Sequence, residues 1–395
     1  MNILAKSEKT APIKNGDKTT WSESPYLIIK GFLMGSADIV PGVSGGTMAL
    51  ITGIYNRLIF AIKSADSKAI SNTFRLRFAK VFEHFHWKFL LLLFTGMILA
   101  VIFFTRIVPL QVYMFTHPEI VYGLFFGLIL GSIFLLLGEV EHSKRNWRGI
   151  LPLAAGGLFG FWIVTLVPTD TPETFLFVFL SGAVSICAMI LPGISGSYIL
   201  LIFRKYDYIL TQLGNIGSAD TLAAALNLIP FILGAVTGLV IFTRVLSWLI
   251  KKHYAVTLLV LVGFLVGSLY VIWPYQDREF EDIVRSVEVL PISDPLVQEL
   301  LERDGLGPAP IYPAPSYKRI GRVINQEASF EQFRKVEVET ISRKLVSSTP
   351  FLPWVEEEKP TKAVDIRGGI LGMFAGLMMI GGISYLRKAG PNSEA

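Results

Sequence analysis

Long apolar runs separated by short polar stretches dominate the pattern along the chain. Six of them approach the length of about 20 residues that a helix needs to cross a bilayer, and they predict spanning helices over residues 89–109, 120–138, 151–167, 228–250, 255–273 and 368–385. Two further apolar regions, residues 26–62 and 175–213, are interrupted near their centres by proline and clustered glycines, which cannot continue a helix unaided. Because unpaired backbone groups in hydrocarbon cost several kcal/mol each, such breaks persist only inside protein or beside a water-filled cavity. The pattern therefore predicts two re-entrant helical hairpins with tips near the middle of the membrane.

The two interrupted regions are copies of one motif. The first copy reads PGVSGGT from Pro41 and the second reads PGISGS from Pro192, and a single register without insertions aligns them. The helices that follow carry Phe-Thr-Arg at matching positions, ending at Arg106 and Arg244, and the next helices share GLILGS and GFLVGS. Each half is therefore predicted to hold one Pro-Gly-broken hairpin and three transmembrane helices. The fold class expected is an all-α polytopic membrane protein made by duplication.

A polar insertion delays the last helix of the second half. It contains the proline-rich stretch PAPIYPAP and has helix-like patterns over residues 294–303 and 330–345, without a metal-ligand or nucleophile pattern. We interpret it as a small extracytoplasmic domain or a loosely folded cap. The organisation predicted for the chain is a tail at 1–24, a first repeat at 25–173, a second repeat at 174–274 and 366–386, the insertion at 275–365, and a tail at 387–395.

Lysine and arginine residues beside the predicted spans indicate their orientation, because short loops rich in these residues stay in the cytoplasm. The N-terminal tail is basic, and so are residues 63–88, 251–252 and 387–388. All of these stretches fall on one side if each hairpin leaves the membrane on the side from which it entered, and only residues 204–205 then depart from the rule. Both termini are predicted to be cytoplasmic and the insertion extracytoplasmic. The two halves would face opposite ways, which is the inverted-repeat arrangement of many transporters.

Composition agrees with the membrane class, since 52% of the 395 residues are hydrophobic and 17% are charged. The formal charge is +5, but the basic residues flank apolar runs instead of forming a stripe on a polar face. We therefore expect membrane lipids as partners and no nucleic acid, and the oligomeric state stays open.

Cys187 is the only cysteine, so neither an intrachain disulfide nor a cysteine-based metal site is possible. No metal, no cofactor and no cleaved signal peptide are predicted.

The repeated motifs carry the chemistry of an anion site. A helix that begins just after a glycine-rich turn exposes unpaired N–H groups and the positive end of its dipole, and both attract anions. We predict that a phosphate binds between the two hairpin tips, with help from an arginine late in each following span; the alternative for the arginines is that they extend to the membrane surface. The predicted phosphate-binding residues are Pro41, Gly42, Ser44, Gly45, Gly46, Thr47, Pro192, Gly193, Ser195, Gly196, Ser197, Arg106 and Arg244.

Asp38 breaks the symmetry between the two copies. It lies three residues before Pro41 in an otherwise apolar stretch, and Met189 occupies the matching position of the second copy. A carboxylate inside the membrane is a candidate functional group, here a proton or sodium coupling site. Its alternative role is to accept hydrogen bonds from the hairpin backbone.

An enzymatic function is the main rival to transport. Residues 42–46 match G-x-S-x-G, so Ser44 could be the nucleophile of an intramembrane serine hydrolase or protease, or of a lipid phosphatase. Such a nucleophile needs a histidine within hydrogen-bond reach, whereas the five histidines all fall in predicted loops or at span ends. A duplicated motif also suits a carrier with two gates better than an enzyme with one nucleophile. A purely structural membrane scaffold is the remaining alternative.

The paired PGVSGGT and PGISGS hairpins resemble those of the polyprenyl-phosphate (undecaprenyl phosphate) transporter family, bacterial membrane proteins formerly catalogued as a domain of unknown function. The resemblance covers residues 31–273 and the last helix. In the first hairpin it extends to Ala37 and Asp38 and to Gly53, where the second copy has Arg204 in place of the family's glycine.

The resemblance implies a transporter, not an enzyme. Its substrate would be the lipid carrier undecaprenyl phosphate, moved from the outer to the inner leaflet of the bacterial cytoplasmic (inner) membrane for reuse in cell-envelope synthesis. A mechanism follows as a hypothesis, in which the two halves rock to alternate access to the phosphate while the isoprenoid tail stays in lipid, with Asp38 as the coupling group.

Overall fold

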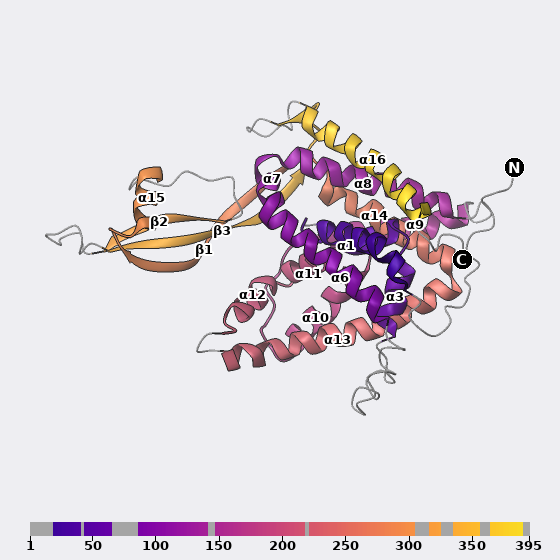
Figure 1. The fold of residues 1–395 in the computed structure, drawn as a ribbon, viewed down its shortest axis with the longest axis horizontal. Helices are drawn as coiled ribbons and strands as arrows, with labels where there is room; N and C mark the ends of the chain where they lie inside the picture. The colour runs from indigo at the N-terminus through magenta and orange to yellow at the C-terminus, as the bar shows by residue number, and fades with distance from the viewer. Residues whose placement is uncertain are drawn as a thin grey trace. The chain divides into compact units, whose positions relative to one another are not determined.

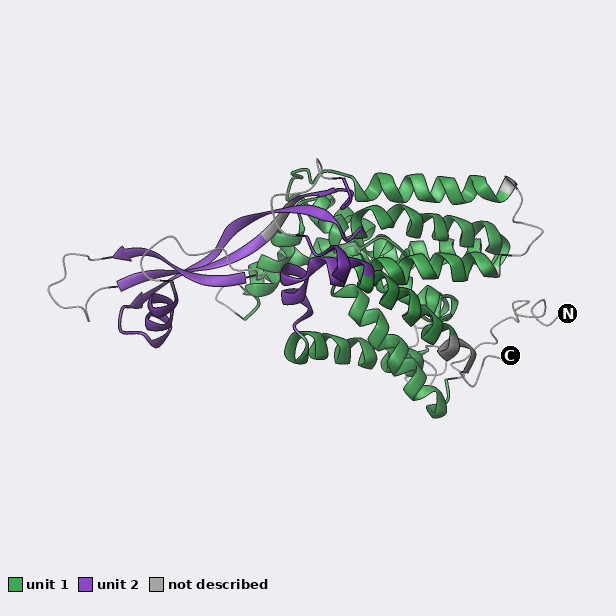
Figure 2. Cartoon of the chain, turned by 90° about the horizontal axis from the view of Figure 1, so that it is seen from above, with its two compact units in different colours: residues 1–108, 123–272, 371–395 green, residues 109–122, 273–370 purple. Residues whose placement is uncertain are grey.

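The structure is a computed structural model, and it describes residues 19–40, 43–64, 86–140, 147–217, 221–304, 316–324, 335–355 and 364–389. The chain divides into two compact units, coloured separately in Figure 2. Unit 1 comprises residues 1–108, 123–272 and 371–395, and unit 2 comprises residues 109–122 and 273–370.

Unit 1 is helical and contains the same series of elements twice (Figure 1). The first series is α1 (Ser24–Asp38), α2 (Gly45–Ile51), α3 (Tyr55–Lys63), α6 (Trp87–Ile102) with a π-helical last turn η2 (Phe103–Ile107), α8 (Pro118–Glu139) and α9 (Trp147–Val164). The second is α10 (Phe175–Ile190), α11 (Gly196–Ile202), α12 (Tyr206–Gly214), α13 (Thr221–Lys252), α14 (Tyr254–Ile272) and α16 (Ile366–Ala389). A short 3-10 turn, η1 (Trp21–Glu23), precedes α1, and the first residues of α8 and α16 belong to unit 2.

Five of these helices are long and apolar enough to cross a membrane: α6 with η2, α8, α13, α14 and α16. Helices α2 and α3 meet the same criterion together but are bent by 118° at the break between them, and α9 and α10 are shorter apolar helices. The prediction of a polytopic membrane protein is therefore confirmed.

Glycines bring the first helices of each series into backbone contact. A methyl group built on Gly31 of α1 would strike the backbone of Leu93 in α6, and one on Gly182 of α10 would strike the backbone of Phe231 in α13. Both contacts occupy matching positions of the two sequence repeats. A second contact in each pair shows the direction of the helices. Gly35 lies against Met97, and both residues come later in their helices than Gly31 and Leu93, so α1 runs parallel to α6. Ala183 lies against Gly238, and both come later than Gly182 and Phe231, so α10 runs parallel to α13.

The later helices pair across the two series. A methyl group on Gly127 of α8 would strike the backbone of Met373 in α16, and one on Gly263 of α14 would strike the backbone of Leu153 in α9. These glycines open the matching GLILGS and GFLVGS motifs. The second spanning helix of each series thus packs against the third of the other, so that the helical scaffold repeats its contacts as well as its sequence. Small residues permit this close approach of membrane helices.

Unit 2 corrects the all-α prediction. It contains a three-stranded antiparallel sheet with strand order β1-β3-β2, formed by β1 (Gln276–Pro291), β2 (Ser316–Ile324) and β3 (Lys335–Pro350), together with α7 (Leu110–Thr116) and α15 (Pro295–Asp304). Helix α15 agrees with the prediction for residues 294–303. The helix predicted over residues 330–345 is wrong for its described part, because residues 335–345 belong to β3, while residues 330–334 lie outside the described residues.

The physical reason for the strand lies in the alternation of its side chains. Val336 and Val338 are buried on one face of β3, where they form a small core with Val297 and Leu300 of α15. Residues that point alternately to two faces suit a strand with one covered side. The charged residues beside the valines gave the segment the appearance of a polar helix. Its buried residues recur at every second position, which is the spacing of a strand.

The glycine contacts in unit 1 can be tested by adding one methyl group. Gly127→Ala and Gly263→Ala are each expected to destabilise the protein by about 1–3 kcal/mol, because the methyl group forces two backbones apart. Gly381→Ala in α16 is the matched control, because no described atom lies within 4 Å of its added methyl group. Thermal unfolding in detergent compares the three, and equal melting temperatures for Gly127→Ala and Gly381→Ala would contradict the packing described above.

Candidate functional site

The end of α10 is the place where the two hairpins of unit 1 meet. Helix α10 ends at Ile190, and the carbonyls at a helix end have no partner within the helix. Ser44 Oγ lies 3.3 Å from the carbonyl oxygens of both Met189 and Leu191, and the Tyr55 hydroxyl donates to the Ile190 carbonyl at 3.1 Å. Side chains of the first hairpin therefore cap the broken helix of the second.

A reciprocal hydrogen bond runs from the second hairpin to the first. The backbone N–H of Gly193 donates to Thr47 Oγ1 at 2.9 Å, and both residues are buried. Gly193 has a φ of +84°, and a Cβ atom there would lie 2.9 Å from the carbonyl oxygen of Phe264. Only glycine combines this backbone conformation with so close an approach. The PG pair of the second motif thus serves the contact between the hairpins.

The N-terminus of α2 is capped by residues of its own hairpin. Ser44 has an extended conformation and accepts a hydrogen bond from the Gly46 N–H at 3.1 Å, while Asp38 Oδ1 accepts one from the Gly45 N–H at 2.7 Å. A Cβ on Gly45 would lie 2.6 Å from Asp38 Oδ2, and one on Gly46 would lie 2.7 Å from the Ile190 carbonyl oxygen. Asp38 therefore makes the backbone contact that we considered as its alternative role, and two N–H groups expected to receive a phosphate are occupied in this conformation.

The second hairpin tip does not repeat this arrangement. Ser195 precedes α11 without capping it, and its hydroxyl instead hydrogen-bonds to that of Ser197 at 2.9 Å. Ser197 is exposed and Ser195 is half-buried, whereas Ser44 and Thr47 are 2% and 0% exposed. The hydroxyls that remain accessible are therefore those of the second copy.

The structure brings together part of the predicted site. Ser44, Gly45, Gly46, Thr47 and Gly193 lie within the contact between the hairpins. Pro192 and Gly196 are buried beside it, and Ser185 Oγ donates to the Gly196 carbonyl at 2.8 Å. Pro41 and Gly42 lie outside the described residues.

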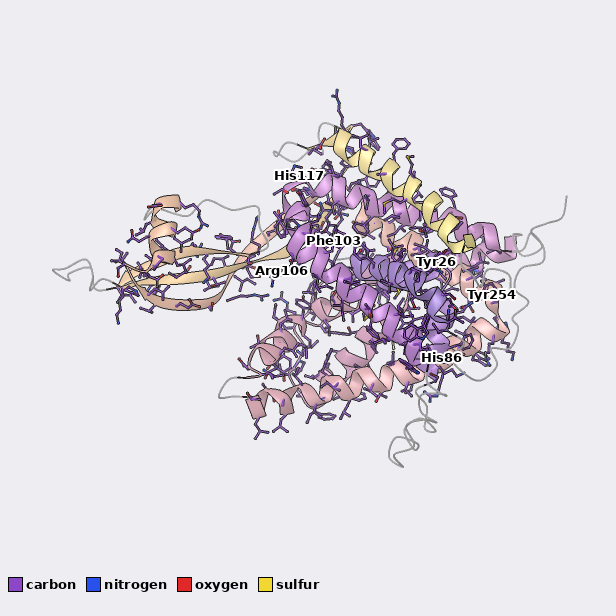
Figure 3. The ribbon with its side chains drawn as sticks, viewed as in Figure 1. Tyr26, His86, Phe103, Arg106, His117 and Tyr254 are labelled. Atoms are coloured by element: carbon purple, nitrogen blue, oxygen red, sulfur yellow. The ribbon has the colours of Figure 1, made fainter. Side chains whose placement is uncertain are left out.

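The two predicted arginines have different surroundings. Arg106 is exposed in the turn that ends α6 (Figure 3), and Arg244 is half-buried with Nη1 donating to the Val240 carbonyl of its own helix at 2.8 Å. Among the described residues, neither arginine has a hydrogen bond to the hairpin tips. The sequence prediction also omitted Tyr55 from the site, although the alignment of Tyr55 with Tyr206 in the two repeats was a usable signal.

Gly53 and Arg204 occupy the same turn of the two hairpins. Gly53 has a φ of +74°, and Arg204, at the matching repeat position, has a φ of +50°. The turn thus demands a left-handed residue in both copies, although one copy supplies arginine, which adopts this conformation at a cost. Arg204 Nε lies 3.4 Å from Asp170 Oδ1 in an exposed ion pair, while the neighbouring Lys205 is buried and donates to the Thr171 carbonyl at 2.6 Å.

The contacts of Ser44 give no support to a hydrolase. Its hydroxyl lies against backbone carbonyls and the Gly46 N–H, and no histidine is its partner in the described part of the chain. His86, labelled in Figure 3, directly precedes α6, and His253 separates α13 from α14. A serine nucleophile would need a base at hydrogen-bonding distance.

The hydrogen bond of Tyr55 is testable against its repeat counterpart. Tyr55→Phe is expected to destabilise the protein by about 1–3 kcal/mol, because it leaves a buried carbonyl of α10 without its donor. Tyr206→Phe is the matched control, because the described contacts give the Tyr206 hydroxyl no comparable backbone acceptor. Thermal unfolding in detergent measures both variants, and equal losses would show that the tip contact contributes nothing specific.

Comparisons with known proteins agree with the repeated hairpins. Residues 34–288 match the family model VCA0040-like, described as undecaprenyl phosphate translocase-like. A protein of Vibrio cholerae named polyprenyl-phosphate transporter is 39% identical over 269 residues, which are 68% of this chain and 83% of the relative. A protein of Staphylococcus aureus with the same name is 31% identical over 258 residues, 62% of this chain and 85% of the relative. No solved structure matches significantly. This multi-pass membrane protein therefore belongs to the undecaprenyl phosphate translocase-like family.

Proposed function

We propose that the protein transports a polyprenyl phosphate, with undecaprenyl phosphate as its substrate, from the outer to the cytoplasmic leaflet of a bacterial cytoplasmic membrane. The lipid would then re-enter cell-envelope synthesis. Two relatives are named for polyprenyl-phosphate transport, which supports the substrate class. The structural observation that carries the proposal is the meeting of two broken helical hairpins, one from each repeat, at a contact rich in hydroxyl and N–H groups.

The helix contacts support an inverted repeat. Arg57, in the first turn of α3, forms an ion pair with Glu23, just before α1, with Nη1 2.8 Å from Oε2, so α3 begins on the side where α1 begins. Lys63 at the end of α3 donates to Ser247 near the end of α13 at 3.2 Å, so α13 ends on that side too. Because α10 runs parallel to α13, the second hairpin enters from the side opposite to the first. With the basic loops in the cytoplasm, both termini are cytoplasmic and the insertion is extracytoplasmic.

Alternating access would follow from exchanging the roles of the two hairpins. In the described conformation the first hairpin caps the end of α10 through Ser44, while Ser195 of the second makes no equivalent bond to the end of α1. In the alternate state Ser195 would cap α1 and Ser44 would be released. Exchange between repeat-related conformations is how inverted-repeat transporters open to either side of the membrane.

The phosphate headgroup would bind where hydroxyl and N–H groups become free of these caps. Ser195 and Ser197 are accessible in the described conformation and are the first candidates to receive it. Donors directed at the phosphate offset the large cost of moving its charge through a medium of low dielectric. The isoprenoid tail is apolar and needs no pocket, since it can remain in the lipid.

Asp38 would couple transport to a proton or sodium gradient. It is exposed at the end of α1, and its Oδ1 holds the Gly45 N–H of the tip that must move. A change in its protonation or ion binding would alter that hydrogen bond and therefore the conformation of the hairpin.

A flipping assay tests the substrate and the serines of the two hairpin tips. In proteoliposomes, the wild type is expected to move undecaprenyl phosphate faster than its diphosphate or an ordinary phospholipid. Ser195→Ala with Ser197→Ala should slow this movement about tenfold or more at an unchanged melting temperature, because hydrogen bonds to a charged group are lost. Ser44→Ala should lower the melting temperature as well. The proposal fails if no lipid moves at any pH or sodium gradient, and release of free phosphate would identify a hydrolase.

Asp38→Asn separates ion coupling from backbone capping, because asparagine keeps the Oδ1 acceptor for Gly45 and loses the charge. Under the coupling proposal, the rate of flipping by this variant should no longer respond to an imposed proton or sodium gradient, while its melting temperature stays near that of the wild type. A variant whose rate responds to the gradient like the wild type would restrict Asp38 to a structural role.

A further inference from the structure

Three cationic side chains converge where α3 and α13 end in unit 1. Lys63 is the last residue of α3, and its Nζ donates to Oγ of Ser247, a residue of α13 that is 0% exposed. Arg244 and Lys251 lie three residues before and four residues after Ser247, on the same face of α13. Lys251 Nζ lies 4.8 Å from the centre of the Phe60 ring in α3. One ammonium group is thus drawn toward a buried hydroxyl while two like charges remain beside it.

No acidic side chain balances this cluster in the part of the chain that the structure describes. Among the ion pairs in which both residues are described, none involves Lys63, Lys251 or Arg244. Lys63 and Arg244 are half-buried, so water solvates them only in part. Like charges held close together with reduced solvation repel one another, and an anion placed among them removes that repulsion.

Ordinary helix capping accounts for only part of the cluster. Cations in the last turn of a helix interact favourably with its dipole, and Lys251 and Lys252 at the end of α13 fit that pattern. Arg244 lies about two turns earlier, and Lys63 reaches across to another helix. These two residues therefore need a different explanation.

Comparison of the repeats shows that the cluster belongs to one end of the protein only. The arginine is the one member present in both copies, and the other three have uncharged counterparts. The matching pairs are Arg244 with Arg106, Lys63 with Gly214, Ser247 with Pro109, and Lys251 with Tyr113. Because the helical scaffold repeats its contacts, this difference marks a feature that only one side of the membrane requires.

We propose that Lys63, Arg244 and Lys251, with the Ser247 hydroxyl, form a binding site for a phosphomonoester headgroup at the end of α13. The inference rests on the proposed transport of a lipid phosphate and adds a site for the headgroup on the cytoplasmic side, apart from the hairpin tips. A phosphomonoester carries a charge between about −1.5 and −2 near neutral pH, whereas a phosphodiester carries one negative charge, so three cations favour the monoester. Inorganic phosphate shares this chemistry and is distinguished below.

Binding by the purified full-length protein in nanodiscs of neutral lipid tests the site. Undecaprenyl phosphate, phosphatidylglycerol and inorganic phosphate are titrated separately against the wild type, Lys63→Gln with Lys251→Gln, and Lys252→Gln. Lys252 is the matched control, since it is the adjacent lysine and its Nζ lies 5.4 Å from the centre of the exposed Trp248 ring instead of in the cluster. A charge-retaining variant, Lys63→Arg with Lys251→Arg, controls for folding.

The double glutamine variant should weaken binding of undecaprenyl phosphate about tenfold or more, while Lys252→Gln and the arginine variant bind like the wild type. Equal weakening in Lys252→Gln would overturn the site in favour of general surface charge. Phosphatidylglycerol binding as tightly as the monophosphate and lost in the same variant would overturn the preference for a monoester.

Tight binding of inorganic phosphate alone would keep the site and reject the lipid. Unchanged affinity in the glutamine variant would remove the site but leave the proposed transport intact, whereas a wild type that binds no polyprenyl phosphate and flips none would reject the transport itself.

Discussion

A helix that ends within the protein must find donors for the carbonyls of its last turn, because these have no partner inside the helix. In unit 1 the end of α10 receives them from Ser44 and Tyr55, two side chains of the other hairpin. The remaining features of the hairpin tips follow from this need. Glycine at positions 46 and 193 lets the backbones approach, and Thr47 accepts the N–H that the second turn leaves free. The end of α10 is therefore satisfied by side chains of the first hairpin, which gives a physical reason for the two hairpins to occur together.

The scaffold around the tips is symmetric, but the tips are not. Glycine contacts recur at matching positions in α1–α6 and α10–α13, and again in α8–α16 and α14–α9. The polar contacts do not recur, since Ser44 is engaged and buried while Ser195 bonds to its neighbour Ser197. Under the proposed alternating access, the same symmetric frame would also hold the arrangement in which the two tips exchange roles. Two such arrangements of one scaffold are what a carrier would require.

Much of this arrangement could be predicted from the chain alone. The motifs at Pro41 and Pro192 indicated paired breaks, and the apolar runs indicated the spanning helices, because both depend on side-chain type and spacing. The acceptors at residues 189–191 could not be predicted, since a backbone carbonyl is the same in every residue and its availability depends on where the helix ends. Strand β3 was missed because its charged residues obscured the alternation of Val336 and Val338. Arg204 was recognised as a departure from the family, but only the backbone angle explains why glycine is usual there.

The glycine contacts also have a mechanical consequence. Two helices whose backbones touch at a glycine cannot slide along each other without first separating, so each such pair moves as one rigid unit. The contacts of Gly127 and Gly263 each join one helix of the first repeat to one helix of the second, so two such rigid pairs connect the halves. Any motion between the halves would therefore be concentrated outside these rigid pairs, in the short helices α2, α3, α11 and α12. A conformational cycle of this protein would accordingly be small in amplitude and confined to the hairpin tips, while the long helices keep their positions.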